Sequence, residues 1–382
     1  MKGISHEKLI HPEVDFIVLN NTRRPTTGGD YVYAVMKDEL TTQGYHLSEM
    51  SIPSLVEPVR NRFSRGIGGS ISLLSAEALA YIRCYISSLR KFRSRSRLMI
   101  TSSCPTFPVF GHLTYHQPKA GIRTDFIKQS GSSMKRMIGY RIQENDKFSP
   151  MWLPAKKLMI VHLSNSAFTQ GLVKEIYGLD SKVLYPPVPV LKYLKANLNA
   201  QRKPYVYINR PQAITGIALL PQITKHLSKD IKVVITGKLD QAGNKTLQAL
   251  KNAEINFEYL GFVEESVKID ILTKSSVYIN LSVNEPFGIS VVEALAAGCI
   301  PLAHDSGGIR EFLPSDFRYS SVGECAEKVA AFINSENRQR EQLRRIALRF
   351  DEANFRRGFM FYVARIEDQL KMGSEEMIVN NC

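Results

Sequence analysis

Two glutamates eight residues apart, Glu285 and Glu293, frame the stretch with the clearest chemical pattern in the sequence. Between them, Pro286 and Gly288 predict a tight turn after a strand, and the following residues predict a helix that begins near Ile289. A helix N-terminus offers unpaired backbone N–H groups and a partial positive charge, which suit a phosphate or sugar hydroxyls. One carboxylate before these amides and one inside the helix could hold two polar ends of one ligand. Taken alone, the same pair would also suit a solvent-facing helix start.

The elements that must position this corner alternate between strand-like and helix-like segments. Short runs rich in β-branched residues predict strands, and longer amphipathic stretches predict helices. Strands that alternate with helices indicate parallel sheets covered by helices, so the fold class is α/β. The predicted strands cover residues 14–19, 98–102, 158–164, 205–209, 232–237, 255–260, 277–282 and 300–304, and the predicted helices cover residues 31–40, 70–92, 216–227, 241–252, 265–274, 289–297 and 334–372.

A proline-rich segment, Tyr185–Pro189, divides the chain, because its prolines make it stiff, extended and non-helical. The 382 residues suffice for two domains at roughly 100 to 200 residues each. We therefore predict an N-terminal domain over 1–188, a C-terminal domain over 189–350, and a final helix over 351–382 that crosses back to the first domain. Doubly wound sheets bind ligands at the carboxyl ends of their strands, here in the crevice between the domains.

Composition excludes several classes of protein. No apolar run reaches the roughly 18 residues that a membrane span needs, and the first residues lack the apolar core of a signal peptide. The five cysteines form no C-x-x-C pair, which argues against a disulfide framework or a zinc site and fits a reducing compartment. We expect a cytoplasmic protein, with peripheral attachment to the inner membrane face left open.

The net charge of +14 is concentrated in the first half of the chain. Residues 1–190 carry 25 Lys and Arg against 14 Asp and Glu, whereas residues 191–382 carry 25 against 22. Within the first half, Arg90–Arg97 places five cations in eight residues at the end of a predicted helix. This run suits either a solvated helix terminus or an anionic membrane surface. Nucleic acid is not an expected partner, because no known binding module accompanies the run.

The corner resembles a known family. It reads E-P-F-G-I-S-V-V-E and is followed by A-L-A-A-G-C-I-P and by Asp305–Glu311, of sequence D-S-G-G-I-R-E. These stretches resemble the retaining family-4 glycosyltransferases of the GT-B fold, whose hallmark is E-x7-E with an internal P-F-G. The resemblance is specific over about residues 180–315 and looser over residues 14–170. It implies two Rossmann-like domains that face a central cleft, with the acceptor on the first domain and a nucleotide sugar on the second.

The resemblance also implies roles for individual residues of the corner. Glu293 would bind the ribose hydroxyls of the donor nucleotide. Glu285 would hold the hydroxyls of the donor sugar near the reacting carbon, helped by the backbone amides of Phe287, Gly288 and Ile289.

Other positions complete the implied donor site. Val263 would pair with the base through its backbone, and Gly237 would lie near the diphosphate. Gly28 and Gly29 look like the family's loop between the first strand and the first helix, where missing side chains let the backbone approach a phosphate. A plain turn is the alternative for these two glycines.

A histidine and two cations raise more specific questions. His116 looks like the family histidine that projects toward the donor sugar, although an isolated histidine is commonly structural. Arg210 fits the family arginine on the diphosphate, but Thr215 stands where a lysine is usual. Either another cation replaces that lysine, with Lys238 as the candidate, or the donor is held unusually, or the protein is impaired. The pair His112 and His116 is not expected to bind zinc, because no H-E-x-x-H motif is present.

Together these features predict an enzyme that moves a hexose-type sugar from a nucleoside diphosphate to an acceptor hydroxyl, with retention of configuration. The acceptor would be a glycan, a lipid-linked saccharide or a small molecule. No cofactor and no essential metal are expected. Two alternatives stay open: a disaccharide phosphorylase of the same fold, and a non-catalytic protein that binds sugar nucleotides.

Overall fold

The computed structural model describes residues 13–18, 28–51, 86, 98–102, 111–117, 161–195, 201–334 and 337–379. Apart from residue 86, the predicted helix over 70–92 lies outside these residues, and so does the basic run Arg90–Arg97. The described residues form two sheets of six strands, and every strand pair in them is parallel. The predicted α/β class with two parallel sheets is therefore confirmed.

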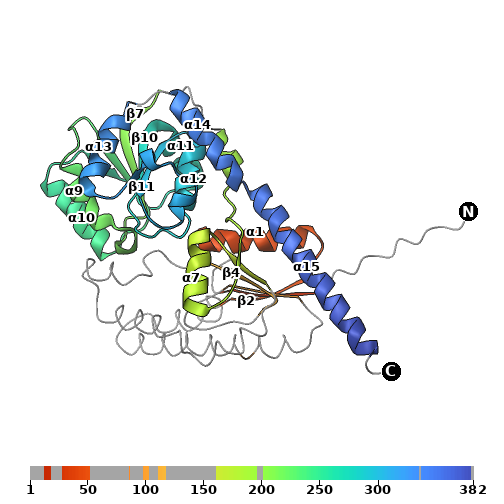
Figure 1. Ribbon diagram of the computed structural model, residues 1–382. Coiled ribbons are helices and arrows are strands. Elements are labelled where there is room, and N and C mark those ends of the chain that lie inside the picture. The colour runs from red at the N-terminus through yellow and green to blue at the C-terminus, as the bar shows by residue number, and fades with distance from the viewer. Residues whose placement is uncertain are drawn as a thin grey trace, which may run out of the picture.

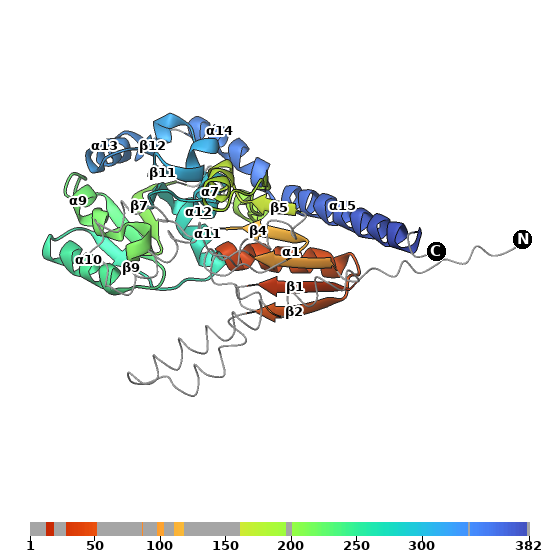
Figure 2. The same ribbon diagram turned by 60° about the horizontal axis from the view of Figure 1, so that its bottom comes forward.

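The first sheet has the strand order β2-β1-β3-β4-β5-β6. Its buried residues are mainly β-branched, aromatic or leucine side chains, as expected of strands covered on both faces. Figure 2 shows β1 and β2 side by side, with their arrowheads toward the second domain. The elements are β1 (Val14–Val18), α1 (Gly28–Thr42), β2 (Leu47–Ser51), β3 (Leu98–Ser102), β4 (Leu113–His116), β5 (Val161–Ser164), α7 (Ala167–Tyr177) and β6 (Lys182–Val183).

The second sheet has the order β12-β11-β10-β7-β8-β9. The chain starts at β7, builds outward to β9, and then returns to the other side of β7 with β10, so the topological switch point lies between β7 and β10. Its strands are β7 (Lys203–Asn209), β8 (Lys232–Thr236), β9 (Phe257–Tyr259), β10 (Ser275–Asn280), β11 (Ile300–His304) and β12 (Arg318–Tyr319). Its helices are α8 (Val190–Leu194), α9 (Leu220–Thr224), α10 (Gln241–Asn252), α11 (Glu265–Lys274), α12 (Ile289–Ala296), α13 (Val322–Phe332) and α14 (Asn337–Ala347).

Two predicted helices are interrupted. The segment 216–227 forms a short 3-10 turn, Ile217–Leu219, and then α9, because Gly216 has a left-handed φ of 75° and Pro221 stands at the helix start. The segment 334–372 breaks at residues 348–351 into α14 and α15 (Glu352–Val379). At this break the Phe350 carbonyl accepts the Val188 N–H at 3.0 Å, so the linker and the returning chain lie side by side.

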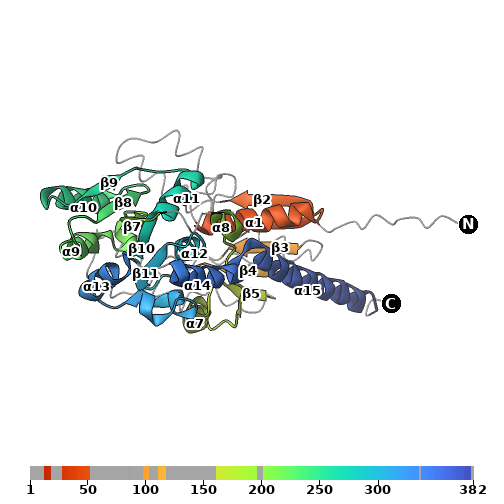
Figure 3. The ribbon, with the colours of Figure 1, turned by 90° about the horizontal axis from the view of Figure 1, so that it is seen from above.

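The last helix, α15, leaves the second domain and packs on the core of the first (Figure 1). Figure 3 shows α14 and α15 following one another along one side of the molecule. Four apolar side chains of α15 belong to the same buried cluster as the strands of the first sheet, namely Phe355, Phe359, Val363 and Ile366. The domain limits at 188 and 350 stay a prediction. Within the described residues, no helix combines the length and apolar composition of a membrane span.

Candidate active site

The predicted strand–turn–helix corner is present at the switch point of the second sheet. All six residues of β10 are buried, and the strand ends at Asn280. The chain then turns through Asn284, with a φ of 52°, and Gly288, with a φ of 99°, into α12. The backbone amides of Phe287 to Ile289 therefore lie at the start of a helix that points its N-terminus toward the carboxyl ends of β7 and β10.

The glycine-containing segment Asp305–Glu311 holds this corner in shape. Gly308 N–H donates to the Glu285 carbonyl at 2.9 Å, and Asn284 N–H donates to Ser306 Oγ at 2.7 Å. Asp305 is itself fixed by ion pairs with Arg310, at 2.9 Å, and with Arg318. The resemblance in these two separate stretches of sequence thus reflects one packed unit.

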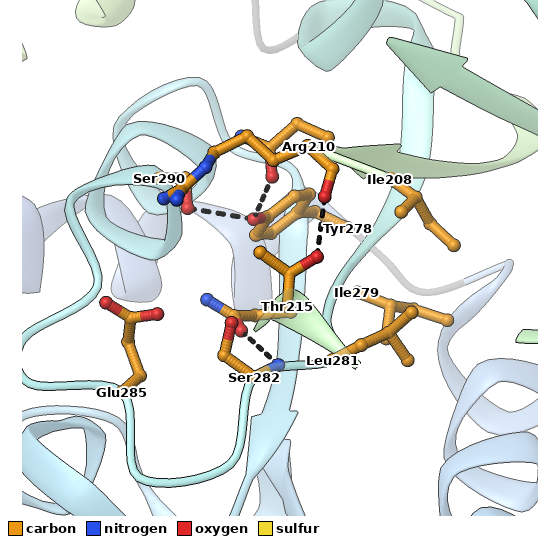
Figure 4. Close-up of a pocket in the computed structure, with 11 residues that line it drawn as sticks. Ile208, Arg210, Thr215, Tyr278, Ile279, Leu281, Ser282, Glu285 and Ser290 are labelled. Carbon is orange, nitrogen blue, oxygen red and sulfur yellow. Dashed lines mark hydrogen bonds between the residues drawn. The ribbon is translucent and has the colours of Figure 1, made fainter. Parts of the chain in front are cut away.

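A pocket opens beside the corner (Figure 4). It is lined by the last residues of β7 and β10, the turn that follows each strand, and the first turn of α12. The lining residues are Ile208, Asn209, Arg210, Thr215, Tyr278, Ile279, Asn280, Leu281, Ser282, Glu285 and Ser290. The structure therefore brings two of the predicted catalytic residues, Arg210 and Glu285, into one pocket.

Glu285 and Arg210 interact electrostatically across this pocket. The pKa of the Glu285 carboxyl is raised overall. Burial raises it and outweighs the positive charge of Arg210 and a hydrogen bond with Ser282, which both lower it. In Figure 4 the side chains of Arg210, Ser290 and Glu285 all reach the same side of the pocket. A half-buried acid and an exposed arginine that face one space can receive a ligand with hydroxyls at one end and negative charge at the other.

Tyr278 links the two walls of the pocket. Its hydroxyl lies 2.8 Å from both Asn209 Oδ1 and Ser290 Oγ, which joins β7 to the first turn of α12. Burial raises the pKa of this phenol, and the negative charges of Glu285 and Glu293 add to the effect. Sequence reasoning missed Tyr278 and Asn209, although Asn209 ends a predicted strand and Tyr278 lies within another.

Glu293 does not line the pocket. It is 7% exposed on α12, and its Oε1 accepts a hydrogen bond from Lys268 Nζ of α11 at 2.9 Å. The Lys268 ammonium also lies over the ring of Tyr193 from α8, 5.4 Å from its centroid. The second acid of the motif is thus a buried, ion-paired carboxylate on α12, and sequence reasoning missed its partner Lys268.

The turn after β7 fixes the backbone of Arg210. Arg210 has a φ of 53°, and its N–H donates to the Thr236 carbonyl at 2.9 Å. The Thr215 hydroxyl donates to the Arg210 carbonyl at 2.5 Å and lies 2.9 Å from the Gln212 carbonyl. The residue in place of the family lysine therefore holds the turn that carries the arginine.

Gly237 packs directly against this turn. A Cβ atom on Gly237 would lie 2.9 Å from the Arg210 nitrogen, and its φ of 111° also requires glycine. Its N–H donates at 2.6 Å to the Gly261 carbonyl, which attaches the loop of Val263 to the end of β8. The neighbouring Lys238 is exposed, and within the described residues it has no ion pair.

The predicted glycines of the first domain meet the corner from the opposite side. Gly28 and Gly29 are the first residues of α1 and not part of a preceding loop, so the helix starts three residues earlier than predicted. A Cβ atom on Gly28 would come within 2.7 Å of Ile289 Cδ1. The N-termini of α1 and α12 therefore meet across the domain boundary, and a side chain at position 28 would disturb that contact.

His116 is the last residue of β4 and is 1% exposed. Its Nε2 lies 3.1 Å from Nδ1 of His162 on β5. Burial and the neighbouring His162 hold the pKa of His116 well below its usual range, and burial lowers the pKa of His162 to about 4. Within the described residues, no group of three or more His, Cys, Asp or Glu side chains is arranged to hold a metal ion.

A carboxylate of the second domain caps a helix of the first. Glu311 accepts the N–H groups of Ala167 and Phe168 at 2.9 and 2.8 Å, at the start of α7. It also accepts the hydroxyl of Tyr185 in the linker at 3.0 Å. The ring of Tyr185 in turn lies 5.7 Å from that of Phe287, so the corner, the linker and α7 form one connected contact.

The chain is similar in sequence to known proteins. Residues 195–349 match the family described as Glycosyl transferases group 1. The chain is 28% identical over 269 residues to a GDP-Man:Man(3)GlcNAc(2)-PP-Dol alpha-1,2-mannosyltransferase of Dictyostelium discoideum, covering 62% of this chain and 52% of that protein. It is 32% identical over 177 residues to the protein of the same name from Candida glabrata, covering 40% and 34%. The chain spans about half the length of the first of these relatives.

Solved structures show the same fold at low sequence identity. A glycosyltransferase from Rickettsia africae superposes with a TM-score of 0.64 at 14% identity, covering 93% of this chain and 98% of that one. WaaG, a glycosyltransferase of lipopolysaccharide biosynthesis, superposes with a TM-score of 0.57 at 11% identity, covering 94% and 99%. The chain thus has the GT-B fold of glycosyltransferases, and its second domain carries the group 1 match. The sequence matches support the expected enzyme class, a glycosyltransferase.

Proposed function

We propose that the chain transfers a hexose-type sugar from a nucleoside diphosphate to an acceptor hydroxyl, with retention of configuration at the sugar carbon. The observation that carries this proposal is the pocket between Arg210 and Glu285, at the switch point of the second sheet and at the N-terminus of α12. Ligands of doubly wound sheets bind at this position, and helix N-termini favour phosphate.

The residues around the pocket suit the two halves of a sugar diphosphate. The charge of Arg210 and the amides of Phe287, Gly288 and Ile289 would stabilise the negative charge that develops on the leaving diphosphate. Glu285 would accept hydrogen bonds from the sugar hydroxyls, and His116 would approach the sugar from the first domain. With these groups in place the transfer needs no metal ion, and Lys238 is the candidate for a second cation.

The nucleoside would extend along α12 toward the adjacent loops. Glu293 would accept the ribose hydroxyls, and the backbone of Val263 would pair with the base. Lys268 Nζ lies 2.9 Å from Glu293 Oε1 and would hold this carboxylate in place to accept the hydroxyls. Gly28, which lies against Ile289, and the neighbouring Gly29 would close the site from the first domain.

The names of the relatives suggest the substrates to test first. Those proteins are described as using GDP-mannose and a mannose-containing oligosaccharide on a dolichol diphosphate. We therefore propose GDP-mannose as the donor and a lipid-linked saccharide as the acceptor. The positive charge of residues 1–190 would favour such an anionic acceptor, and Arg90–Arg97 would contact an anionic membrane surface.

The decisive experiment measures binding and turnover separately. Purified chain is titrated with GDP-mannose, UDP-glucose and ADP-glucose by calorimetry, and sugar transfer to a lipid-linked acceptor is then assayed. Glu293→Ala should weaken nucleotide binding by roughly 10- to 100-fold, since hydrogen bonds to a charged group contribute about 1.5–3 kcal/mol. Glu285→Ala should mainly lower kcat. Glu327→Ala, on the exposed face of α13, serves as the control. Small and equal effects of both site variants would contradict the assignment.

Thr215 favours one second candidate, a protein that binds a sugar nucleotide without transferring it. Its hydroxyl serves the Arg210 turn, so this position supplies no cation to the diphosphate. Tight binding of a nucleotide sugar, with no transfer to any acceptor and no release of nucleoside diphosphate, would favour this candidate over the enzyme.

A further inference from the structure

The parallel register of β4 and β5 places His116, the last residue of β4, beside His162, the second residue of β5. Thr114 of β4 pairs with His162 of β5, and His116 pairs with Ser164. Side chains two residues apart on a strand share a face, so Thr114, His116 and His162 lie on the same side of the sheet. His162 therefore stands diagonally across from His116, at a separation that two imidazole rings can bridge.

The two rings meet through one specific pair of nitrogens. His116 Nε2 lies 3.1 Å from His162 Nδ1, the ring centroids are 5.3 Å apart, and the ring planes are inclined by 34°. The side chains are 1% and 8% exposed, so water does not compete for this contact. An N–H···N bond between neutral imidazoles needs one protonated and one unprotonated nitrogen. The tautomer of each ring is therefore tied to that of the other.

The surrounding backbone makes this arrangement rigid. The carbonyl of His116 accepts the Asn165 N–H at 3.2 Å, so the end of β4 is tied to the residue that follows β5. Ser164 Oγ lies 2.7 Å from Ser181 Oγ, which ties β5 to the residue before β6. His116, at the end of β4, and His162, within β5, thus stand on strands whose positions are fixed by their neighbours.

We propose that His162 is a positioning residue for His116. It holds the His116 ring in one orientation and one tautomer, so that Nδ1 presents a fixed hydrogen-bonding character toward the bound donor sugar. This inference rests on the proposed function, because the sugar is the group that His116 would meet. A second histidine is suited to this task, since its ring nitrogen pairs with Nε2 without introducing a charge into the buried sheet end.

The test is a double-mutant cycle with a conservative rescue. His162→Leu fills the space but removes the nitrogen, whereas His162→Asn places an amide near the position of Nδ1 that can donate or accept. We expect His162→Leu to lower kcat by roughly 10-fold with KM nearly unchanged, because the His116 ring loses a hydrogen bond and its fixed orientation. His162→Asn should recover most of the activity. In a His116→Ala background, His162→Leu should have almost no further effect, because coupled residues are not additive.

A second readout is independent of turnover. In protein labelled with ¹⁵N-histidine, the wild-type His116 ring should show a single tautomer, and His162→Leu should convert it into a mixture. Three results would overturn the inference: a mixed tautomer in the wild-type protein, equal losses from His162→Leu in both backgrounds, or no rescue by Asn. Failure of the proposed function looks different, because wild-type protein would then bind the nucleotide sugar without transferring sugar while its tautomer spectrum stayed as expected.

Discussion

The contact of Glu311 with α7 is an interdomain helix cap whose removal should loosen one defined part of the first domain. The two N–H groups of Ala167 and Phe168 have no partner within α7, because the first N–H groups of any helix lack one. A carboxylate from the other domain satisfies both, at 2.9 and 2.8 Å, and places negative charge at the positive end of the helix. Ser166 caps the same helix locally through Thr169, so α7 should stay folded without Glu311.

The expected magnitude follows from these bonds. Loss of a helix cap typically destabilises by about 0.5–2 kcal/mol, and here the freed N–H groups can turn to water at a partly exposed helix start. We therefore expect Glu311→Ala to lower the free energy of local opening by about 1–2 kcal/mol. Since about 1.4 kcal/mol corresponds to a factor of ten, amide exchange at residues 167 and 168 should accelerate by roughly 5- to 30-fold.

Hydrogen exchange followed by mass spectrometry of the peptide spanning residues 165–172 measures this change. The matched control is Glu324→Ala, because Glu324 accepts the Ser320 N–H at 2.7 Å at the start of α13, entirely within the second domain. That control should speed exchange near residue 320 and leave the α7 peptide unchanged. Unaltered exchange of the α7 peptide in Glu311→Ala, or an equal acceleration in both variants, would refute the idea that the cap joins the domains.

Two further predictions concern the turn after β7 and the histidine pair. Thr215→Lys should lower the thermal midpoint and fail to raise activity. The change removes the hydrogen bonds of Thr215 to the Arg210 and Gln212 carbonyls and places a charge at a site that is 9% exposed. We expect the free energy of unfolding to fall by roughly 1–3 kcal/mol. Higher activity with unchanged melting would contradict this. The pKa of His162 is lowered by burial from 6.5 to about 4, so the unfolded chain binds its proton first as pH falls. The contribution of His162 to the free energy of unfolding is therefore fully present above pH 6.5. It is lost as the pH falls toward 4, by about 3 kcal/mol in total. Denaturant titrations at several pH values should show that the stability of the wild-type protein falls more steeply below pH 6.5 than that of His162→Asn. Equal pH dependence of the two stabilities would refute the prediction.

The sequence predicted elements best where the local pattern is clear, as a continuous apolar run for a buried strand or an amphipathic stretch with a recognisable start and end for a helix. The strand over 300–304 and the helices over 241–252 and 265–274 agree with the observed bounds of β11, α10 and α11. It missed β2 and β4, because L-S-E-M-S and L-T-Y-H are short and mix polar with apolar residues. Those strands depend on pairing with β1, β3 and β5, which lie elsewhere in the sequence.

The candidate site likewise contains residues that the sequence predicts and residues that it does not. The E-x7-E motif, Arg210 and the glycines could be found because their spacing is local. The partners could not: Lys268 is 25 residues from Glu293, His162 is 46 residues from His116, and Phe168 is 143 residues from Glu311. Contacts of this kind follow from strand register and domain packing, which periodicity along the chain does not encode.

The path of α15 has a consequence for the order in which this protein is assembled. A ribosome releases the strands of the first sheet early, but Phe355, Phe359, Val363 and Ile366 of the same apolar cluster emerge only after the whole second domain. The first domain therefore keeps part of its apolar core exposed until α15 has been synthesised, whereas the second domain can fold as soon as it has left the ribosome. The domain that is translated first is the one completed last.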